Sequence, residues 1–277
     1  MCSLEKDTQD EYVAQLQMAW PVTIAMLLRR SVDLISVIFV GHISRKYLAG
    51  VGLATVTANV TGYSIMIGFV GGMSTQASIA KGANDIPALI LALQRMLVLG
   101  LLVCIPISLL WYNAEGIISQ LGQSAEIARS AGTYITILIP GLWSYSIAAT
   151  LQTWFYAQSD TKNILKFAVL QTLMHPLVNY FLIYTCDLGW LGAAWAASAS
   201  KAMYAIFLLI YLDRKYIKGK QLPCLTFSYN SFTGMLPLLK LALPNILMMS
   251  EWWASEAIIF LSGLLDNPEL HVSAMSI

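Results

Sequence analysis

Long apolar stretches separated by short polar segments dominate this sequence. Each holds about 20 mostly apolar residues, the length that a helix needs to cross roughly 30 Å of hydrocarbon. Backbone amide and carbonyl groups find no water inside a bilayer, so each stretch is expected to be a helix, which satisfies these groups internally. The pattern therefore predicts an all-α fold, a polytopic membrane helix bundle with about seven transmembrane helices, at residues 16–41, 50–73, 91–112, 132–156, 164–185, 190–212 and 238–265.

The composition agrees with a membrane protein and argues against several other classes. Of the 277 residues, 57% are hydrophobic and only 11% are charged, so the lipid bilayer is the expected partner. A net charge of +1 argues against a nucleic-acid partner. The four cysteines share no close spacing, and the sequence lacks the HExxH, GxSxG and P-loop signatures. We therefore expect no enzyme, no metal site and no cofactor, which leaves transport or reception.

Lysine and arginine are distributed unevenly between the segments that join the stretches. With a cytoplasmic N-terminus, only Arg45, Lys46 and Arg129 would lie on the outer side. Cytoplasmic loops normally carry the excess of basic residues, so we expect the N-terminus to be cytoplasmic. The choice between plasma and vacuolar membrane stays open. The inner side would hold the larger group, Lys6, Lys81, Arg95, Lys162, Lys166, Arg214, Lys215, Lys218, Lys220 and Lys240.

The polar segments divide the chain into four expected parts. Residues 1–15 are predicted to form a cytoplasmic N-terminal tail, and residues 16–212 a six-helix lobe. Residues 213–237 form the longest connection, which is basic and is interpreted as a cytoplasmic linker. Residues 238–277 would then begin a second lobe, with its first helix only.

An internal similarity supports this division. The segment "LQMAWP" opens the first stretch at Leu16, and "LKLALP" opens the seventh at Leu239, an offset of 223 residues. The same offset aligns Asp33 with Glu256. Parallel repeats of this kind occur in some secondary transporters.

Charged side chains inside the stretches are the first candidates for function, because the bilayer interior strongly disfavours charge. The first stretch contains Arg29, Arg30 and Asp33. Asp33 lies four and three residues after the arginines, on the same helix face, which favours charge compensation within this helix. Lys201, near the middle of the sixth stretch, is expected to pair with another group or to face a water-filled cavity. The sequence does not identify its partner.

A histidine also lies inside an apolar stretch. His175 precedes Pro176 and is followed one helical turn later by Asn179. The pattern fits a histidine that packs with satisfied hydrogen bonds, and it also fits a proton relay. Asn179 is kept as a secondary candidate site residue.

Two acids flank two tryptophans in the seventh stretch, "MMSEWWASE". At 100° per residue, Glu251 and Glu256 lie about 140° apart around the helix and belong to two separate polar stripes. Apolar surroundings disfavour the charged form of a carboxyl group, which suits reversible protonation near neutral pH. Trp252 and Trp253 would offer π faces to an organic cation, or would pack against neighbouring helices and lipid.

These motifs together resemble a known family, the multidrug and toxic compound extrusion (MATE) transporters, in their eukaryotic branch. The strongest match is "LALPNILMMSEWWASEAIIFLSGLL", which is similar to the proline, E-W-W-x-x-E and L-S-G signature of that branch's seventh span. The segments "FVGHI", "NVTGYS", Gln94-Arg95, "PISLLW", "YITILIPGL" and "LGWLGAAWA" follow the family order along essentially the whole chain.

The resemblance implies twelve helices in two six-helix lobes that export solutes by alternating access. It implies a small organic cation or xenobiotic as substrate, and a proton or sodium as the coupling ion in place of any cofactor. It also implies a role in cation coupling and substrate recognition for Glu251 and, less directly, for Glu256.

The sequence also departs from the family pattern. Ser36 stands where bacterial relatives have an aspartate, and "MSTQASIAKGA" places Ser74, Ile79 and Lys81 in an otherwise regular second-span motif. Because the chain stops where an eighth span is expected, we interpret it as a fragment that lacks its C-terminal lobe or pairs with a second copy. An inactive or regulatory half-transporter is the alternative. A seven-span receptor is a third possibility, but it requires an external N-terminus.

Overall fold

The computed structural model describes residues 2–43, 45–249 and 253, and this part of the chain is helical without strands. Three π-helical segments continue neighbouring α-helices, so α2, η1 and α3 form one rod, as do α7 with η2 and α8 with η3. The elements are α1 (Cys2–Ile43), α2 (Arg45–Ala58), η1 (Asn59–Tyr63), α3 (Ser64–Gly82), α4 (Ile86–Tyr112), α5 (Ala114–Gln120), α6 (Ala125–Ala157), α7 (Thr161–Tyr180), η2 (Phe181–Thr185), α8 (Trp190–Leu212), η3 (Asp213–Lys218), α9 (Tyr229–Phe232) and α10 (Leu236–Met248).

Six helical segments of the described chain are long and apolar enough to cross a membrane. The first five overlap the second to sixth predicted stretches, and the sixth, Tyr229–Met248, overlaps the beginning of the seventh, which confirms the all-α membrane bundle. The first predicted stretch lies in α1, which is 42 residues long but is not among the segments whose length, hydropathy and low charge suit a membrane span. Its apolar run is interrupted by Arg29, Arg30 and Asp33, of which Arg29 and Asp33 contact side chains of other helices.

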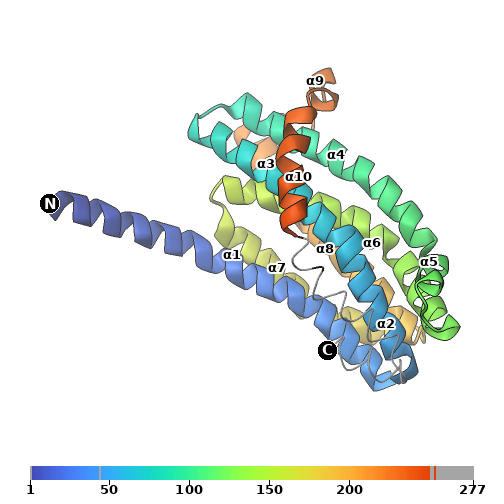
Figure 1. Cartoon of the computed structure of the whole chain (residues 1–277). Coiled ribbons are helices and arrows are strands. Elements are labelled where there is room, and N and C mark those ends of the chain that lie inside the picture. The colour runs from blue at the N-terminus through green and yellow to red at the C-terminus, as the bar shows by residue number, and fades with distance from the viewer. Residues whose placement is uncertain (1, 44, 250–252, 254–277) are drawn as a thin grey trace.

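Helix α1 extends through the segment predicted to be a polar tail. It runs without a break from Cys2, so the expected boundary at residue 16 is not a helix end. Figure 1 shows its N-terminal part projecting away from the other helices, while its C-terminal part lies along α7. Large side chains on the projecting part are exposed, among them Tyr12, Leu16 and Trp20.

Helix α6 is the centre of the bundle. It packs against α2, α3, α4, α5 and α8, while α1 lies against α7, α2 and α8 (Figure 1). The largest fully buried side chains include Trp154 and Trp111. The indole N–H of Trp154 donates to the carbonyl of Leu89 at 3.0 Å, which ties α6 to α4. This arrangement places polar residues of α1, α2, α6 and α8 around one interior space.

A carboxylate joins the turn between α6 and α7 to the end of α8. Asp160 accepts hydrogen bonds from the Tyr211 hydroxyl and the Lys215 ammonium, both at 2.6 Å, and from the Asn163 amide at 2.9 Å. Burial raises the pKa of Asp160, but the hydrogen bonds from Lys215, Tyr211 and Asn163 outweigh this and lower the pKa below its usual value. The carboxylate therefore stays ionised, and this link persists, throughout the neutral pH range.

Helix α10, the described part of the seventh predicted span, packs against α3 through glycines. A Cβ atom at Gly68 would lie 2.6 Å from the Cα of Ile246, and one at Gly72 would lie 2.9 Å from the amide nitrogen of Ala242. The two helix backbones are therefore in direct contact (Figure 1). Glycines in membrane helices commonly serve such close helix packing.

Replacing Gly68 with alanine is expected to loosen this contact. The new methyl group would overlap the backbone of Ile246, so we expect the substitution to lower the free energy of unfolding by about 1–3 kcal/mol. Thermal unfolding of the purified chain in detergent measures the effect. Gly82→Ala is the matched control, because a Cβ there meets nothing within 4 Å. Equal melting temperatures for the two variants would contradict the close packing of α10 on α3.

Candidate functional site

The centre of the candidate site is an ion pair between two membrane helices. The Lys201 Nζ of α8 lies 3.1 Å from the Asp33 Oδ1 of α1. Their side chains are only 9% and 27% exposed, so both charges are largely removed from solvent. The partner of Lys201, which the sequence could not name, is therefore Asp33. Asp33 thus pairs with a residue 168 positions away, on another helix.

The π-helical segment η1 forms the opposite wall of the site. It contains Gly62, where a Cβ would lie only 3.1 Å from Cη2 of Trp111 and still closer to the neighbouring ring carbon. The indole N–H of Trp111 donates to the Thr61 hydroxyl at 2.8 Å. These contacts hold the widened turn in place, and Asn59 and Tyr63 from the same turn line the site. Single π turns inside α-helices are frequent at functional sites.

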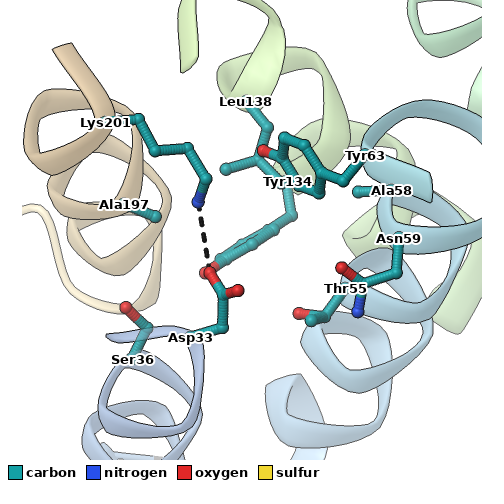
Figure 2. Close-up of a pocket in the computed structure, with 10 residues that line it drawn as sticks. All are labelled: Asp33, Ser36, Thr55, Ala58, Asn59, Tyr63, Tyr134, Leu138, Ala197 and Lys201. Atoms are coloured by element: carbon teal, nitrogen blue, oxygen red, sulfur yellow. Dashed lines mark hydrogen bonds and ion pairs between the residues drawn. The ribbon is translucent and has the colours of Figure 1, made fainter. Parts of the chain in front are cut away.

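Side chains from four helical rods line this interior space, and three of the rods, α1, α2 with η1, and α6, supply oxygen atoms. Figure 2 shows Asp33 at its floor, with the ammonium of Lys201 reaching it from one side and Thr55 and Asn59 lying on the other. The remaining cavity has a volume of only about 10 Å³. This is the space of about one water molecule, so no organic solute fits beside the ion pair in this conformation. The lining residues are Asp33, Ser36, Thr55, Ala58, Asn59, Tyr63, Tyr134, Leu138, Ala197 and Lys201.

Another cation, the partly buried Arg29 of α1, lies in separate surroundings. The Nη1 of Arg29 donates to Oε1 of Gln152 at 2.6 Å. Its guanidinium carbon also lies 5.1 Å from the ring centroid of Tyr145 and 5.9 Å from that of Tyr204. Neutral amide and aromatic groups therefore stabilise this charge, which leaves Asp33 to Lys201.

His175 joins three helices beside the ion pair. Its Nε2 lies 2.9 Å from the Ser36 hydroxyl of α1 and 2.8 Å from the Asn179 amide nitrogen, and its Nδ1 lies 2.6 Å from the Ser200 hydroxyl of α8. Because the amide nitrogen can only donate, Nε2 acts as an acceptor, and Nδ1 carries the proton of a neutral ring. His175 and Asn179 are both fully buried. This arrangement matches the expected packing histidine with satisfied hydrogen bonds.

Most candidate residues of the seventh span lie outside the described part of the chain. These are Glu251, Trp252 and Glu256, and their predicted role stays a prediction. Trp253 is described, and its indole nitrogen is buried without a hydrogen-bond partner among the described residues. Of the candidate residues predicted from the sequence, Asp33 lines the cavity. Asn179 is connected to the cavity wall through His175, which contacts Ser36.

Sequence reasoning missed the side chains that complete the site. Thr55, Asn59, Tyr63 and Tyr134 did not stand out, because hydroxyl and amide groups are common in membrane helices. The segment "NVTGYS", which contains Asn59 and Tyr63, was noticed only as a family motif. Its combination of a polar pair with a glycine was the available signal for a local change in helix geometry.

Comparison with known proteins assigns the chain to a family. A sequence model of the MatE family matches residues 21–181. The chain belongs to the MatE family. Members of this family are transporters and not enzymes, so the expectation of a non-enzymatic membrane protein is confirmed.

Individual relatives of this MatE chain come from plants. It is 36% identical to Protein DETOXIFICATION 12 of Arabidopsis thaliana, over 94% of this chain and 54% of that protein. It is 32% identical to Protein DETOXIFICATION 16 of the same organism, over 99% of this chain and 56% of that protein. The chain thus spans little more than half the length of these relatives.

The fold agrees with a solved member of the family. The crystal structure of the eukaryotic MATE transporter AtDTX14 superposes with a TM-score of 0.84 at 31% sequence identity, over 95% of this chain and 60% of that one. The predicted eukaryotic branch is therefore confirmed, together with the membrane bundle.

Proposed function

We propose that this MatE chain forms the first lobe, and the first helix of the second lobe, of a secondary active exporter. The exporter moves small organic cations or xenobiotics out of the cytoplasm in exchange for protons or sodium. Its N-terminus lies in the cytoplasm, as the distribution of lysine and arginine predicts. The observation that carries the proposal is the match of nearly the whole chain to DETOXIFICATION proteins and to a eukaryotic MATE transporter.

Coupling in this proposal comes from competition for the carboxylates of the seventh span. Glu251, assisted by Glu256, binds the coupling cation when the site faces outward and the organic cation when it faces inward. In a low-dielectric environment, two cations at one negative site would repel each other at a high free-energy cost, so binding of one favours release of the other. Trp252 and Trp253 contribute aromatic faces to the organic cation.

Transport by proteoliposomes tests the role of Glu251. The transporter consists of this chain together with a C-terminal lobe, and the probe is a radiolabelled quaternary ammonium ion driven by an imposed pH or sodium gradient. Glu251→Gln is expected to abolish gradient-driven transport, because glutamine cannot carry the exchanged charge. Glu115→Gln is the control, since Glu115 is exposed on α5 and outside the proposed machinery. Unchanged transport by Glu251→Gln would refute the coupling role.

A half-transporter is the second candidate, because the chain spans only about half the length of its relatives. One lobe cannot rock against itself, so the chain alone would need a second copy to transport. Reconstitution of these 277 residues with a measurement of oligomeric state separates the cases. Transport by a homodimer supports a complete exporter from two copies, whereas inert monomers support an inactive or regulatory half, or a missing C-terminal lobe.

A further inference from the structure

We propose that the space around Asp33 is a binding site for a small monovalent cation, and that the ammonium group of Lys201 is its resident occupant. The carboxylate comes from α1, and the cation comes from α8 of the same chain rather than from solution. The site therefore accepts a free cation only when the lysine side chain is removed. The ligand class is a primary alkylammonium ion or sodium.

The lining has the chemistry of such a site. Asp33 supplies one negative charge, and Ser36, Thr55, Asn59 and the nearby tyrosines supply neutral oxygen atoms. Among the described residues that line the cavity, Asp33 is the one carboxylate. Hard cations and ammonium groups both bind oxygen atoms. A single negative charge within a set of neutral oxygens suits a monovalent cation better than a divalent one.

The geometry around the ammonium is that of a bound ion with an incomplete shell. The Lys201 Nζ has three donors, and in the described part of the chain one hydrogen bond is found, to the Oδ1 of Asp33. The same nitrogen lies 4.9 Å from the ring centroid of Tyr63, a cation–π contact. The Tyr63 hydroxyl is buried and has no hydrogen-bond partner among the described residues. Donor and acceptor capacity is therefore left over on both sides of the ammonium (Figure 2).

Structural stabilisation alone gives a weaker account of the pair. A buried ion pair is often no more stable than well-packed apolar residues of similar volume, so a lobe that needed only packing would gain little from two buried charges. The small residual cavity, about 10 Å³, is a further indication, because well-packed apolar contacts would fill it. A site filled by a tethered cation explains the charge, the oxygen lining and the small remaining space together.

The tethered ammonium has a consequence for coupling, which rests on the function proposed above. Because Lys201 already neutralises Asp33, the first lobe has no vacant carboxylate here for a coupling ion. The exchanged cation would then bind in the seventh span. The test of the site uses binding alone, so its failure is distinguishable from failure of the transport proposal.

Chemical rescue of a lysine variant tests the site. The purified 277-residue chain carrying Lys201→Ala is placed in lipid nanodiscs and titrated with methylammonium, ethylammonium and tetramethylammonium. We expect the two primary ammonium ions to bind and to raise the melting temperature, since ligand binding to the folded state stabilises it. Tetramethylammonium, which has no N–H donor, is expected to have no effect. The wild-type chain is expected to show no rescue.

A second variant shows whether Asp33 is responsible. In Lys201→Ala with Asp33→Asn, the affinity for methylammonium is expected to fall about 30-fold or more, because a desolvated charge partner is lost. Lys218→Ala is the control for a general effect of amines, since Lys218 pairs with Asp213 at 2.7 Å on the exposed surface. No rescue is expected there.

Two outcomes would overturn the proposal. One is a folded Lys201→Ala chain that binds neither primary ammonium ion. The other is binding of methylammonium or sodium to the wild-type chain that disappears in Asp33→Asn, because the resident ammonium would then not occupy the site. If Lys201→Ala does not fold, Lys201→Met replaces it with ²²Na⁺ as the probe. Sodium binding that depends on Asp33 supports the site, and its absence overturns it.

Discussion

Replacing Lys201 with methionine is expected to lower the free energy of unfolding of the bundle by about 3–5 kcal/mol, because the Asp33 carboxylate would remain buried without its partner. The substitution of its partner, Asp33→Asn, is also expected to lower the free energy of unfolding, since it leaves the ammonium of Lys201 without a counter-charge. Both side chains are mostly buried, at 9% and 27% exposure, so water cannot replace the lost partner fully.

The double variant distinguishes a paired charge from two independent polar groups. Lys201→Met with Asp33→Asn removes both charges, so we expect it to be clearly more stable than the sum of the two single losses predicts. Unfolding in mixed micelles of increasing dodecyl sulfate content, followed by tryptophan fluorescence, measures all four proteins. Dodecyl sulfate is added as its tetramethylammonium salt in a sodium-free buffer, so that no small cation fills the vacant site.

A surface pair in the same chain is the matched control. Lys218 and Asp213 lie 2.7 Å apart, closer than the buried pair at 3.1 Å, but are 73% and 40% exposed. Lys218→Met is therefore expected to change the free energy of unfolding by about 0–1 kcal/mol. Additive losses in the cycle of Asp33 and Lys201 would show that the two charges are not coupled.

The apolar pattern predicted the membrane helices because each span must satisfy its own backbone, which is a local requirement. The charged positions inside the spans could also be recognised in the sequence, because charged residues are rare in apolar segments. The sequence did not show which charged residues pair with each other. Asp33 lies one turn from Arg29 in the sequence, yet it pairs with Lys201, 168 residues away. The spacing of Arg29 and Asp33 along one helix would allow them to pair. The packing of α1 against α8 instead brings Asp33 to Lys201.

The shape of the site was less predictable than its charges. Asn59 and Tyr63 line the cavity from η1, a π-helical turn that the apolar pattern of a continuous span did not predict. The turn is held in place by Trp111 of α4, whose ring packs against Gly62 and whose indole N–H donates to Thr61. A local sequence pattern contains no information on such a tertiary contact. The family motif marked the segment without indicating its geometry.

The second large effect is expected for Gln94, which attaches the segment after η3 to the N-terminal third of α4. Its buried amide nitrogen donates to the carbonyls of Pro223 and Thr226 at 3.0 Å and of Cys224 at 3.3 Å. Its amide oxygen accepts from the buried hydroxyl of Ser231 at 2.7 Å. One side chain thus satisfies several backbone and side-chain groups of the segment that leads to α9 and α10.

Gln94→Leu keeps the size of the side chain and removes every one of these hydrogen bonds. Each buried polar group left without a partner costs about 1–3 kcal/mol, so we expect the linker to detach locally before the bundle unfolds. Hydrogen exchange of residues 219–235 is expected to accelerate, while exchange in α6 stays unchanged. Gln158→Leu is the control, because its amide nitrogen has no hydrogen-bond partner among the described residues. Equal exchange of the linker in both variants would show that Gln94 does not hold it, and the start of the seventh span would then need another anchor.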